Sequence, residues 1–272
     1  MIDYGFESQM SADTKGTFQG KVAIVTGAGS GIGRAIALLL AARGAAVAIV
    51  DLSPEGSVTL AEIHDAGGKA LFLKGNVTDS EFVASVFADT VRAFGGLDIL
   101  CNNAGVLRLA DSFELTTDKQ YEETFGVNVK AVFEFSRAAL PFLKSRGKGS
   151  IVNTASMVGY RLGMEGHAIY GASKAAVVGL SLTMALELAP FGIRVNCVAP
   201  GVVATSLYVD EFLKSHDRSE LESGSDATLK AIPNGSYARP DQIAETVAFL
   251  ASDAADYVTG QTILVDGGYA TR

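Results

Sequence analysis

Cysteine and histidine are scarce in this chain. It has two cysteines, Cys101 and Cys197, in 272 residues, which is too few for a disulfide framework. Each follows an apolar run typical of a strand, so we expect two buried, reduced thiols and a reducing, cytoplasmic location. Of the three histidines, neither His64 nor His216 has further ligand residues at metal-binding spacing. No catalytic metal is therefore expected.

Positive charge and long apolar runs are also lacking. Lys and Arg number 22 against 30 Asp and Glu, a formal net charge of −8, which argues against binding to nucleic acid or to an anionic membrane. The longest apolar run, residues 35–42, is too short to span a bilayer. Residues 1–19 lack the basic and apolar regions of a signal peptide. They are expected to form a flexible tail on a soluble protein.

The chain does have short apolar runs that alternate with helix-like segments. Strands are predicted at 21–26, 45–51, 69–77, 97–105, 149–156, 192–201 and 262–268. Helices are predicted at 32–43, from Ser53 onward, and at 79–94, 117–146 (interrupted near Pro141), 169–190 and 240–252. This alternation predicts a doubly wound, Rossmann-type α/β fold, with a seven-stranded parallel sheet and helices on both faces. Residues 20–272 are expected to form one domain, with 206–239 as a substrate lid.

The loop after the first predicted strand, TGAGSGIG at 26–33, is rich in glycine. Gly27, Gly31 and Gly33 are spaced G-x-x-x-G-x-G, which suits a tight turn that approaches a pyrophosphate closely. The helix that follows offers free N–H groups to the anion. With Ser30 and Ile32, this loop is expected to bind a dinucleotide; a merely tight turn is the alternative.

An acidic residue, Asp51, ends the second predicted strand about twenty residues past this loop. A carboxylate there accepts hydrogen bonds from the adenosine ribose and repels a 2′-phosphate. Leu52 is expected beside the same ribose. Ser30 is neutral, and Arg34 is the one nearby cation that complicates the assignment. We therefore expect NAD rather than NADP; a helix cap is the alternative role of Asp51.

A tyrosine and a lysine stand one helical turn apart in YGASK, residues 170–174. Residues i and i+4 share a helix face. A free phenol has a pKa near ~10, and a nearby ammonium lowers it. Tyr170 could then exchange a proton with an alcohol near neutral pH. Because many helices contain this spacing by chance, ordinary helix surface is the alternative.

Several motifs accompany this pair in a fixed order. They are TGAGSGIG at 26–33, NNAG at 102–105, Asn128 in VNV, Ser156, YGASK at 170–174 and PGVVAT at 200–205. Over roughly residues 20–268, the chain resembles a single-domain short-chain dehydrogenase/reductase. The resemblance implies an NAD-dependent oxidoreductase that moves a hydride between nicotinamide and a secondary alcohol or ketone. It also implies a homotetramer, with helices 117–146 and 169–190 between subunits.

The resemblance further implies roles for individual residues. Tyr170 would be the general acid/base, and Lys174 would lower its pKa and hold the nicotinamide ribose. Ser156 would orient the substrate oxygen, and Asn128 would hold a water that links Lys174 to solvent. Other cofactor contacts would come from Asn76, Val77, Asn102, Asn103, Ala104, Gly105, Pro200, Gly201, Val203 and Thr205.

Two departures from the family pattern bear on these roles. The usual Asp-Val after the third strand is here Asn76-Val77, and Ser156 and Tyr170 are separated by a long loop. We expect a small change in adenine affinity from the first and a change of loop shape, not of chemistry, from the second.

The substrate is the least determined part of the sequence-based prediction. His167 is a candidate contact, and apolar residues of the site loops are candidates for a substrate wall or for ordinary core: Val106, Leu109, Met157, Met164, Val202 and Leu207. Two other functions stay open. One is an NADPH-linked reductase of 3-oxoacyl thioesters, and the other is a dinucleotide-binding regulator without turnover.

Overall fold

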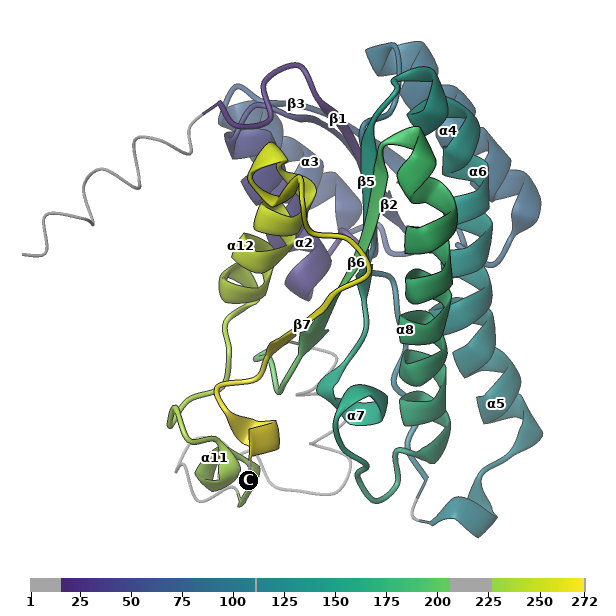
Figure 1. Cartoon of the computed structure of the whole chain (residues 1–272), viewed down its shortest axis with the longest axis vertical. Coiled ribbons are helices and arrows are strands. Elements are labelled where there is room, and N and C mark those ends of the chain that lie inside the picture. Colours follow the sequence, from purple (N-terminus) through teal and green to yellow (C-terminus); the bar gives the residue numbers. More distant parts are fainter. Residues whose placement is uncertain (1–15, 111, 206–226, 272) are drawn as a thin grey trace, which may run out of the picture.

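A single sheet forms the centre of the protein (Figure 1). The computed structural model describes residues 16–110, 112–205 and 227–271. All neighbouring strands pair in parallel, in the order β3-β2-β1-β4-β5-β6-β7. The strands are β1 Val22–Thr26, β2 Ala46–Asp51, β3 Lys69–Lys74, β4 Ile99–Asn102, β5 Gly149–Thr154, β6 Ile193–Pro200 and β7 Thr262–Val265. The predicted seven-stranded, doubly wound fold is confirmed.

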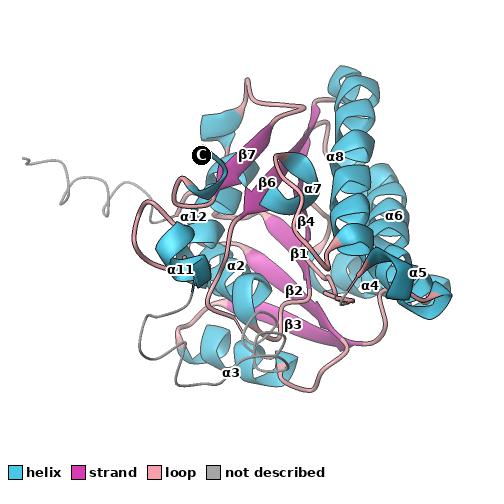
Figure 2. Ribbon diagram, turned by 90° about the horizontal axis from the view of Figure 1, so that it is seen from below, coloured by secondary structure: helices cyan, strands magenta, loops and turns pink. Residues whose placement is uncertain are grey.

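Helices cover both faces of the sheet (Figures 1 and 2). One face carries α2 Gly31–Ala42, α3 Gly56–Asp65 and α12 Pro240–Ala251; the other carries α4 Ser80–Phe94, α5 Asp118–Phe125, α6 Ala131–Ser145 and α8 Ala168–Leu188. Successive strand residues point to opposite faces. In β1, Ala23 and Val25 therefore pack in the core of the first face, and Ile24 packs in the core of the second. Short helices α7 Met157–Tyr160 and α11 Ala227–Ala231 lie in the loops at the carboxyl ends of the strands.

Most differences from the predicted boundaries lie at the carboxyl ends of strands. The strands β3, β4, β5 and β7 each end earlier than expected. In β4 the reason is visible, because the backbone N–H groups of Asn103 and Ala104 leave the ladder and bond to the Thr26 hydroxyl. Helix α3 begins at Gly56 rather than directly after Ser53, since a turn between Pro54 and Ser57 precedes it.

The helix predicted over 117–146 is interrupted, but the predicted place is wrong. Pro141 lies inside α6, which continues to Ser145. The break is a π-helical turn, Gly126–Lys130, between α5 and α6. A π turn inserts one extra residue into a helix, and such turns are frequent at functional sites. Asn128 lies in the middle of this one.

Several expectations fall outside the described residues. These include residues 1–15 of the expected tail and residues 206–226 of the expected lid, with Leu207. The rest of the lid includes α11 and a bridge between Val203 and Ala238. Among the described residues, one helix, Ala168–Phe191, is long and apolar enough by composition to cross a membrane. Its first part, α8, packs against β6 and α5, and its Lys174 and Val177 are buried in this packing.

Candidate active site

The glycine loop between β1 and α2 is closely packed against its neighbours. Gly27 has a φ of +66°, and a Cβ there would lie 2.8 Å from the Cα of Ala104. A Cβ on Gly33 would lie 2.0 Å from the carbonyl oxygen of Gly27. Gly31 has a φ of +52°, and a Cβ there would lie 3.1 Å from the methyl group of Thr205. The loop therefore meets the segments after β4 and β6, which were predicted to bind the same cofactor.

Asp51 lies at the end of β2, beside this loop. Its Oδ2 accepts a hydrogen bond from the Gly29 N–H at 2.7 Å, and its Oδ1 accepts one from the Ser53 N–H at 2.8 Å. Both oxygens retain a lone pair for ribose hydroxyls. Leu52 follows with 65% of its surface exposed. Arg34, the complicating cation, is paired with Glu62 of α3.

The two asparagines of the NNAG segment after β4 have different roles. The Asn103 amide donates to the carbonyl of Thr26 at 3.1 Å, which holds the segment against the glycine loop. Asn102 was also expected on the adenosine side, but its side chain is buried and donates to Ser136 of α6 and Asn153 of β5. Thr26, whose hydroxyl organises this corner, was not singled out as a site residue, although it begins the glycine motif.

The remaining expected cofactor residues lie in two loops. Asn76 is exposed and accepts from the Thr78 N–H at 3.0 Å, whereas Val77 is buried. After β6, which ends at Pro200, a Cβ on Gly201 would lie 2.7 Å from the Cα of Asp266. Val203 is buried and Thr205 donates to its carbonyl at 3.4 Å.

Ser156, Tyr170 and Lys174 meet at the carboxyl end of β5. The Ser156 side chain lies close enough to the Tyr170 phenol to act against the rise of its pKa. Ser156 also caps α7 by accepting from the Val158 N–H at 3.2 Å. The Lys174 side chain is buried, and its Nζ donates to the Thr154 carbonyl at 2.8 Å. That nitrogen lies 5.8 Å from the centre of the Tyr170 ring.

The pKa values in this group differ from the sequence-based expectation. Burial raises the pKa of Tyr170, and the Ser156 side chain opposes this only in part. Burial lowers the pKa of Lys174 to about 8, against a smaller opposing effect of Cys197. The expected lowering of the Tyr170 pKa by Lys174 is therefore not what this arrangement produces. The ammonium points to the Thr154 carbonyl, and desolvation of the phenol outweighs the other effects.

Asn128 connects three elements at the base of the site. It is fully buried; its Oδ1 accepts from the Val106 N–H at 2.8 Å, and its Nδ2 donates to the Val106 carbonyl at 3.0 Å. The same Nδ2 donates to the Ser173 hydroxyl at 3.1 Å. Both amide hydrogens are thus used within the protein. The expected water link from Asn128 to Lys174 stays a prediction. Ser173, inside YGASK, was not predicted as its partner.

The expected substrate residues surround Tyr170 unequally. His167 lies edge-on to the Tyr170 ring, with 6.2 Å between ring centres and an interplanar angle of 74°. Met164 and Val202 are partly exposed, whereas Met157 is 3% exposed and leaves little surface for a substrate. Gly105 lies beside the catalytic group, since a Cβ there would be 3.5 Å from the Lys174 Nζ.

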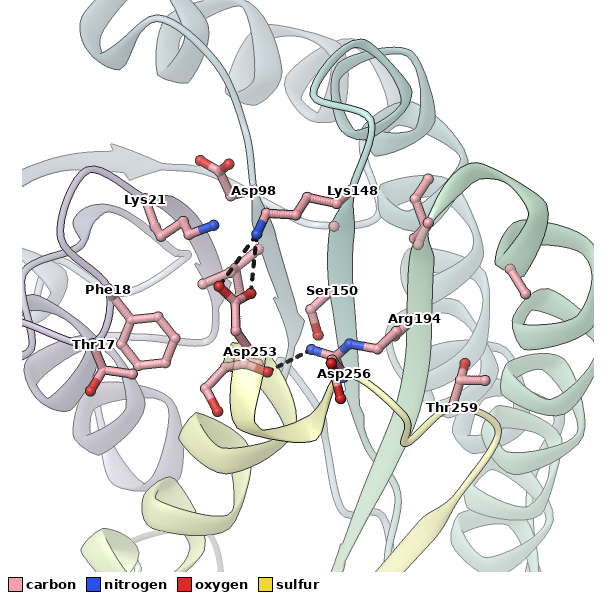
Figure 3. Close-up of a pocket in the computed structure, with 17 residues that line it drawn as sticks. Thr17, Phe18, Lys21, Asp98, Lys148, Ser150, Arg194, Asp253, Asp256 and Thr259 are labelled. Atoms are coloured by element: carbon pink, nitrogen blue, oxygen red, sulfur yellow. Dashed lines mark hydrogen bonds and ion pairs between the residues drawn. The ribbon is translucent and has the colours of Figure 1, made fainter. Parts of the chain in front are cut away.

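A separate hollow of about 510 Å³ opens near the amino ends of β1, β5 and β6 (Figure 3). Lys148 pairs there with Asp253, and Arg194 donates to the carbonyls of Leu250 and Ser252. These contacts tie β5 and β6 to the end of α12. The hollow is far from Tyr170. Among the residues that the structure describes, no group of three or more His, Cys, Asp or Glu could hold a metal ion.

The residues at the carboxyl ends of the strands fit a nicotinamide dinucleotide. The tightly packed glycines leave no room for a side chain at Gly33, and Asp51 presents acceptors beside them. Ligands of doubly wound sheets bind in the crevice beyond the carboxyl ends of the strands. The Ser156–Tyr170 pair lies at the same edge and can exchange a proton with a substrate oxygen.

Comparisons with known proteins agree with this site. The family described as Enoyl-(Acyl carrier protein) reductase matches residues 27–270. A 3-oxoacyl-(acyl-carrier-protein) reductase FabG from Thermotoga maritima is 39% identical over 251 residues, covering 92% of this chain and 98% of the relative. A D-threitol dehydrogenase from Mycolicibacterium smegmatis is 41% identical over 267 residues, covering 97% and 98%.

Solved structures give the same result. The crystal structure of levodione reductase matches with a TM-score of 0.88 and 33% identity, covering 93% of this chain and 99% of that one. A structure described as an NAD(P) dependent gluconate 5-dehydrogenase from Beutenbergia cavernae, with NADP at low occupancy, matches with a TM-score of 0.84 and 37% identity, covering 93% and 98%. The chain therefore belongs to the short-chain dehydrogenase/reductase family of oxidoreductases that bind a nicotinamide dinucleotide.

Proposed function

We propose that this protein is an NAD-dependent oxidoreductase that interconverts a secondary alcohol and a ketone, with Tyr170 as general acid/base. The observation that carries the proposal is that Ser156, Tyr170 and the buried Lys174 lie together, with the Lys174 Nζ 5.8 Å from the centre of the Tyr170 ring. A phenol beside a second hydroxyl is suited to hold one substrate oxygen between the two groups. The Gly105 backbone lies close to the same lysine, since a Cβ there would be 3.5 Å from its Nζ.

The chain's own residues would orient the substrate and move its proton. A bound nicotinamide supplies the hydride chemistry and, when oxidised, a positive charge. In ketone reduction, Tyr170 donates its phenolic proton to the substrate oxygen, and Ser156 holds that oxygen in line. In alcohol oxidation, the Tyr170 oxygen takes the proton back. Lys174, with a pKa of about 8, is charged through neutral pH and would hold the ribose hydroxyls. Asn128 would position α8 through Ser173.

The preference for NAD rests on Asp51 and Arg34. The carboxylate lies at the end of β2, where a 2′-phosphate would face its negative charge, and Arg34 is already paired with Glu62. The alternative is an NADPH-linked reductase of 3-oxoacyl thioesters. It is favoured by the 39% identity to the reductase FabG and by NADP in the gluconate 5-dehydrogenase structure. Cofactor preference separates these two functions.

The test is a panel of secondary alcohols, cyclic, aromatic, hydroxyacyl and polyol, supplied with NAD or NADP and followed by nicotinamide absorbance. We expect turnover with NAD. In Asp51→Ala and Asp51→Asn, the ratio of kcat/KM for NAD to that for NADP should fall on the order of 10–100-fold, which corresponds to a like-charge repulsion of about 1.4–2.7 kcal/mol. Asp65→Asn is the matched control. It removes a carboxylate at the far end of α3, away from the glycine loop, and should leave this ratio unchanged.

Two results would contradict this assignment. A wild-type preference for NADP that Asp51→Asn leaves unchanged would favour the 3-oxoacyl thioester reductase. Binding of NADH without turnover on any alcohol or ketone of the panel would favour a regulator without catalysis. The set formed by Asn128, Ser156, Tyr170 and Lys174 argues against the regulator, because such a protein has no need of a proton-transfer pair.

The proposal includes the organisation of the chain. We propose that residues 20–272 form one catalytic domain of a cytoplasmic enzyme, with 1–19 as a tail and 206–239 as a substrate lid. Both cysteines are free and buried, as suits a reducing compartment. The substrate is a small alcohol or ketone, and no contact with nucleic acid or membrane is proposed.

We propose that the protein forms a homotetramer and that the outer face of α8 is a contact between subunits. Small and apolar residues recur there at helical spacing and are exposed: Ala172, Ala175, Gly179, Leu182 and Leu186. Leu182 is 49% exposed and Leu186 is 80% exposed. Phe133 of the neighbouring α6 is 44% exposed (Figure 1). A helix face of this kind is suited to bury itself against another helix.

Leu186→Glu is expected to weaken this assembly. A charge placed in a closely packed apolar contact is costly to bury, so the apparent mass in solution should fall below that of a tetramer. Light scattering after size-exclusion chromatography measures it. Val58→Glu, on α3, changes an exposed apolar residue (54%) on another helix and should leave the mass unchanged. A Leu186→Glu protein with the wild-type mass would exclude this face as the subunit contact.

A further inference from the structure

His167 is held in place by contacts on three sides. Its Nδ1 lies 2.7 Å from the carbonyl oxygen of Glu165, and its backbone N–H donates to the Met164 carbonyl at 3.1 Å. The loop that carries it is tied to the opposite loop, where the Ala110 N–H donates to the Gly166 carbonyl at 3.2 Å. The imidazole lies edge-on to Tyr170. The ring therefore has a fixed place beside the catalytic phenol.

The contact with Glu165 determines which nitrogen of the ring carries the proton. A carbonyl oxygen can only accept, so Nδ1 must be the donor. In the neutral imidazole, Nε2 then has a free lone pair and accepts hydrogen bonds. Near Tyr170, the ring thus offers an acceptor to a ligand. A substrate hydroxyl is a matching donor, whereas a hydrocarbon group has nothing to donate.

The two arginines of the neighbouring loops have partners within the protein, so neither is placed to select an anionic substrate. Arg108, on the loop opposite His167, is paired with Glu123 at 3.1 Å, and Arg161 lies over the Tyr160 ring. Apolar residues make up much of the surrounding loops. Among the described residues of those loops, His167 thus combines a free acceptor with direct contact to the Tyr170 ring.

We propose that the Nε2 atom of His167 accepts a hydrogen bond from a second substrate hydroxyl, and that the substrate is a vicinal diol or its α-hydroxy ketone. This inference rests on the proposed function, since Tyr170 and Ser156 must hold the reacting oxygen. In the oxidation, the C–H bond gives its hydride to the oxidised nicotinamide and the O–H bond gives its proton to Tyr170. The second hydroxyl stays intact, and its carbon is not oxidised.

Wild-type protein provides the first test. Cyclohexanol is compared with cyclohexanediol whose hydroxyls are adjacent, in both cis and trans isomers, and kcat/KM is measured for each. We expect at least one diol isomer to be favoured roughly tenfold or more, the value of a hydrogen bond that only the diol makes. Equal or better kcat/KM with cyclohexanol would overturn the inference. Turnover of neither alcohol, together with turnover of a monohydroxy alcohol from the panel, would overturn the inference but not the proposed function. Absence of turnover on the whole panel would overturn both.

Two variants distinguish the effect of the Nε2 acceptor from the effect of the shape of the ring. His167→Phe keeps an aromatic ring against Tyr170 but removes the acceptor, and the ratio of diol to cyclohexanol kcat/KM should fall roughly tenfold. His167→Gln replaces Nε2 with a carboxamide that can still accept, so most of the ratio should remain. His64→Phe makes the same change on α3 as a control for the substitution. A wild-type ratio in His167→Phe, measured with cyclohexanol turnover still present, would exclude this role.

Discussion

Replacement of Tyr170 by Phe is expected to lower turnover by on the order of 10²–10⁴, the range that removal of a general acid/base gives. The change deletes one hydroxyl and keeps the ring that packs on His167. The fold and the glycine loop are untouched, so binding of NADH, measured by fluorescence titration, should stay close to that of the wild type. Loss of chemistry with retained cofactor binding is the expected combination.

A neighbouring tyrosine provides the control for this experiment. Tyr160 ends α7, and Arg161 lies over its ring. Tyr160→Phe removes an equivalent hydroxyl close to the site and should retain most of the activity. Near wild-type turnover in Tyr170→Phe would refute the mechanism. Equal losses in both variants would point to packing rather than to proton transfer.

The pKa of Tyr170 predicts opposite pH dependences for the rates of ketone reduction and of alcohol oxidation. Burial raises this pKa above its ordinary value, so the phenol stays protonated through neutral pH. Ketone reduction uses the protonated phenol and should hold through neutral pH and decline in alkaline solution. Alcohol oxidation uses the deprotonated oxygen and should rise with pH. Because the ammonium of Lys174 loses its proton above about pH 8, its hold on the ribose should weaken there and limit that rise.

Gly33→Ala is expected to weaken cofactor binding strongly. The new methyl group would lie 2.0 Å from the Gly27 carbonyl oxygen and 2.5 Å from the Asn103 amide, and no side-chain rotation relieves a clash at Cβ. Either α2 moves away from β1 or the loop opens, and both displace the N–H groups that meet the pyrophosphate. We expect the Kd for NADH to rise by about 100-fold, which corresponds to ~2.7 kcal/mol, near the upper end of the usual cost of overpacking. Isothermal titration calorimetry measures it.

Gly163→Ala is the matched control, because a Cβ at Gly163 meets no atom within 4 Å. Its Kd for NADH should equal that of the wild type. Circular dichroism establishes whether each variant is folded. A folded Gly33→Ala protein with unchanged NADH affinity would show that the loop does not approach the dinucleotide. An unfolded one would be compared with Gly31→Ala, where the neighbouring threonine methyl group at 3.1 Å can yield and the remaining strain comes from the φ of +52°.

The fold was predictable because its signals are local. Buried parallel strands are apolar throughout. The runs KVAIVT and AAVAIVD have this pattern and therefore predict two buried strands. The glycine loop was predictable because few residues adopt a positive φ, as Gly27 and Gly31 do. The shared face of Tyr170 and Lys174 follows from helix geometry alone.

Other features of the site depend on distant partners and could not be predicted. The side chain of Lys174 could point to Tyr170 or to a strand carbonyl, and the backbone of β5 decides this through Thr154. The pKa of Tyr170 depends on how much water the surrounding loops exclude, which no spacing encodes. Arg34 stood as a possible phosphate ligand until its pairing with Glu62, a residue of the next helix, was visible.

The π turn at Gly126–Lys130 has a consequence for how this chain can vary in length. One residue of an α-helix corresponds to about 100° of rotation about its axis. Deleting one residue from this turn would restore a regular helix but would rotate α5 by that angle about α6. Residues of α5 that face α8 would turn away, and Asn128 would lose Val106 and Ser173 together. The stretch from α5 to α6 therefore tolerates substitution far better than a change of length, unlike a surface loop.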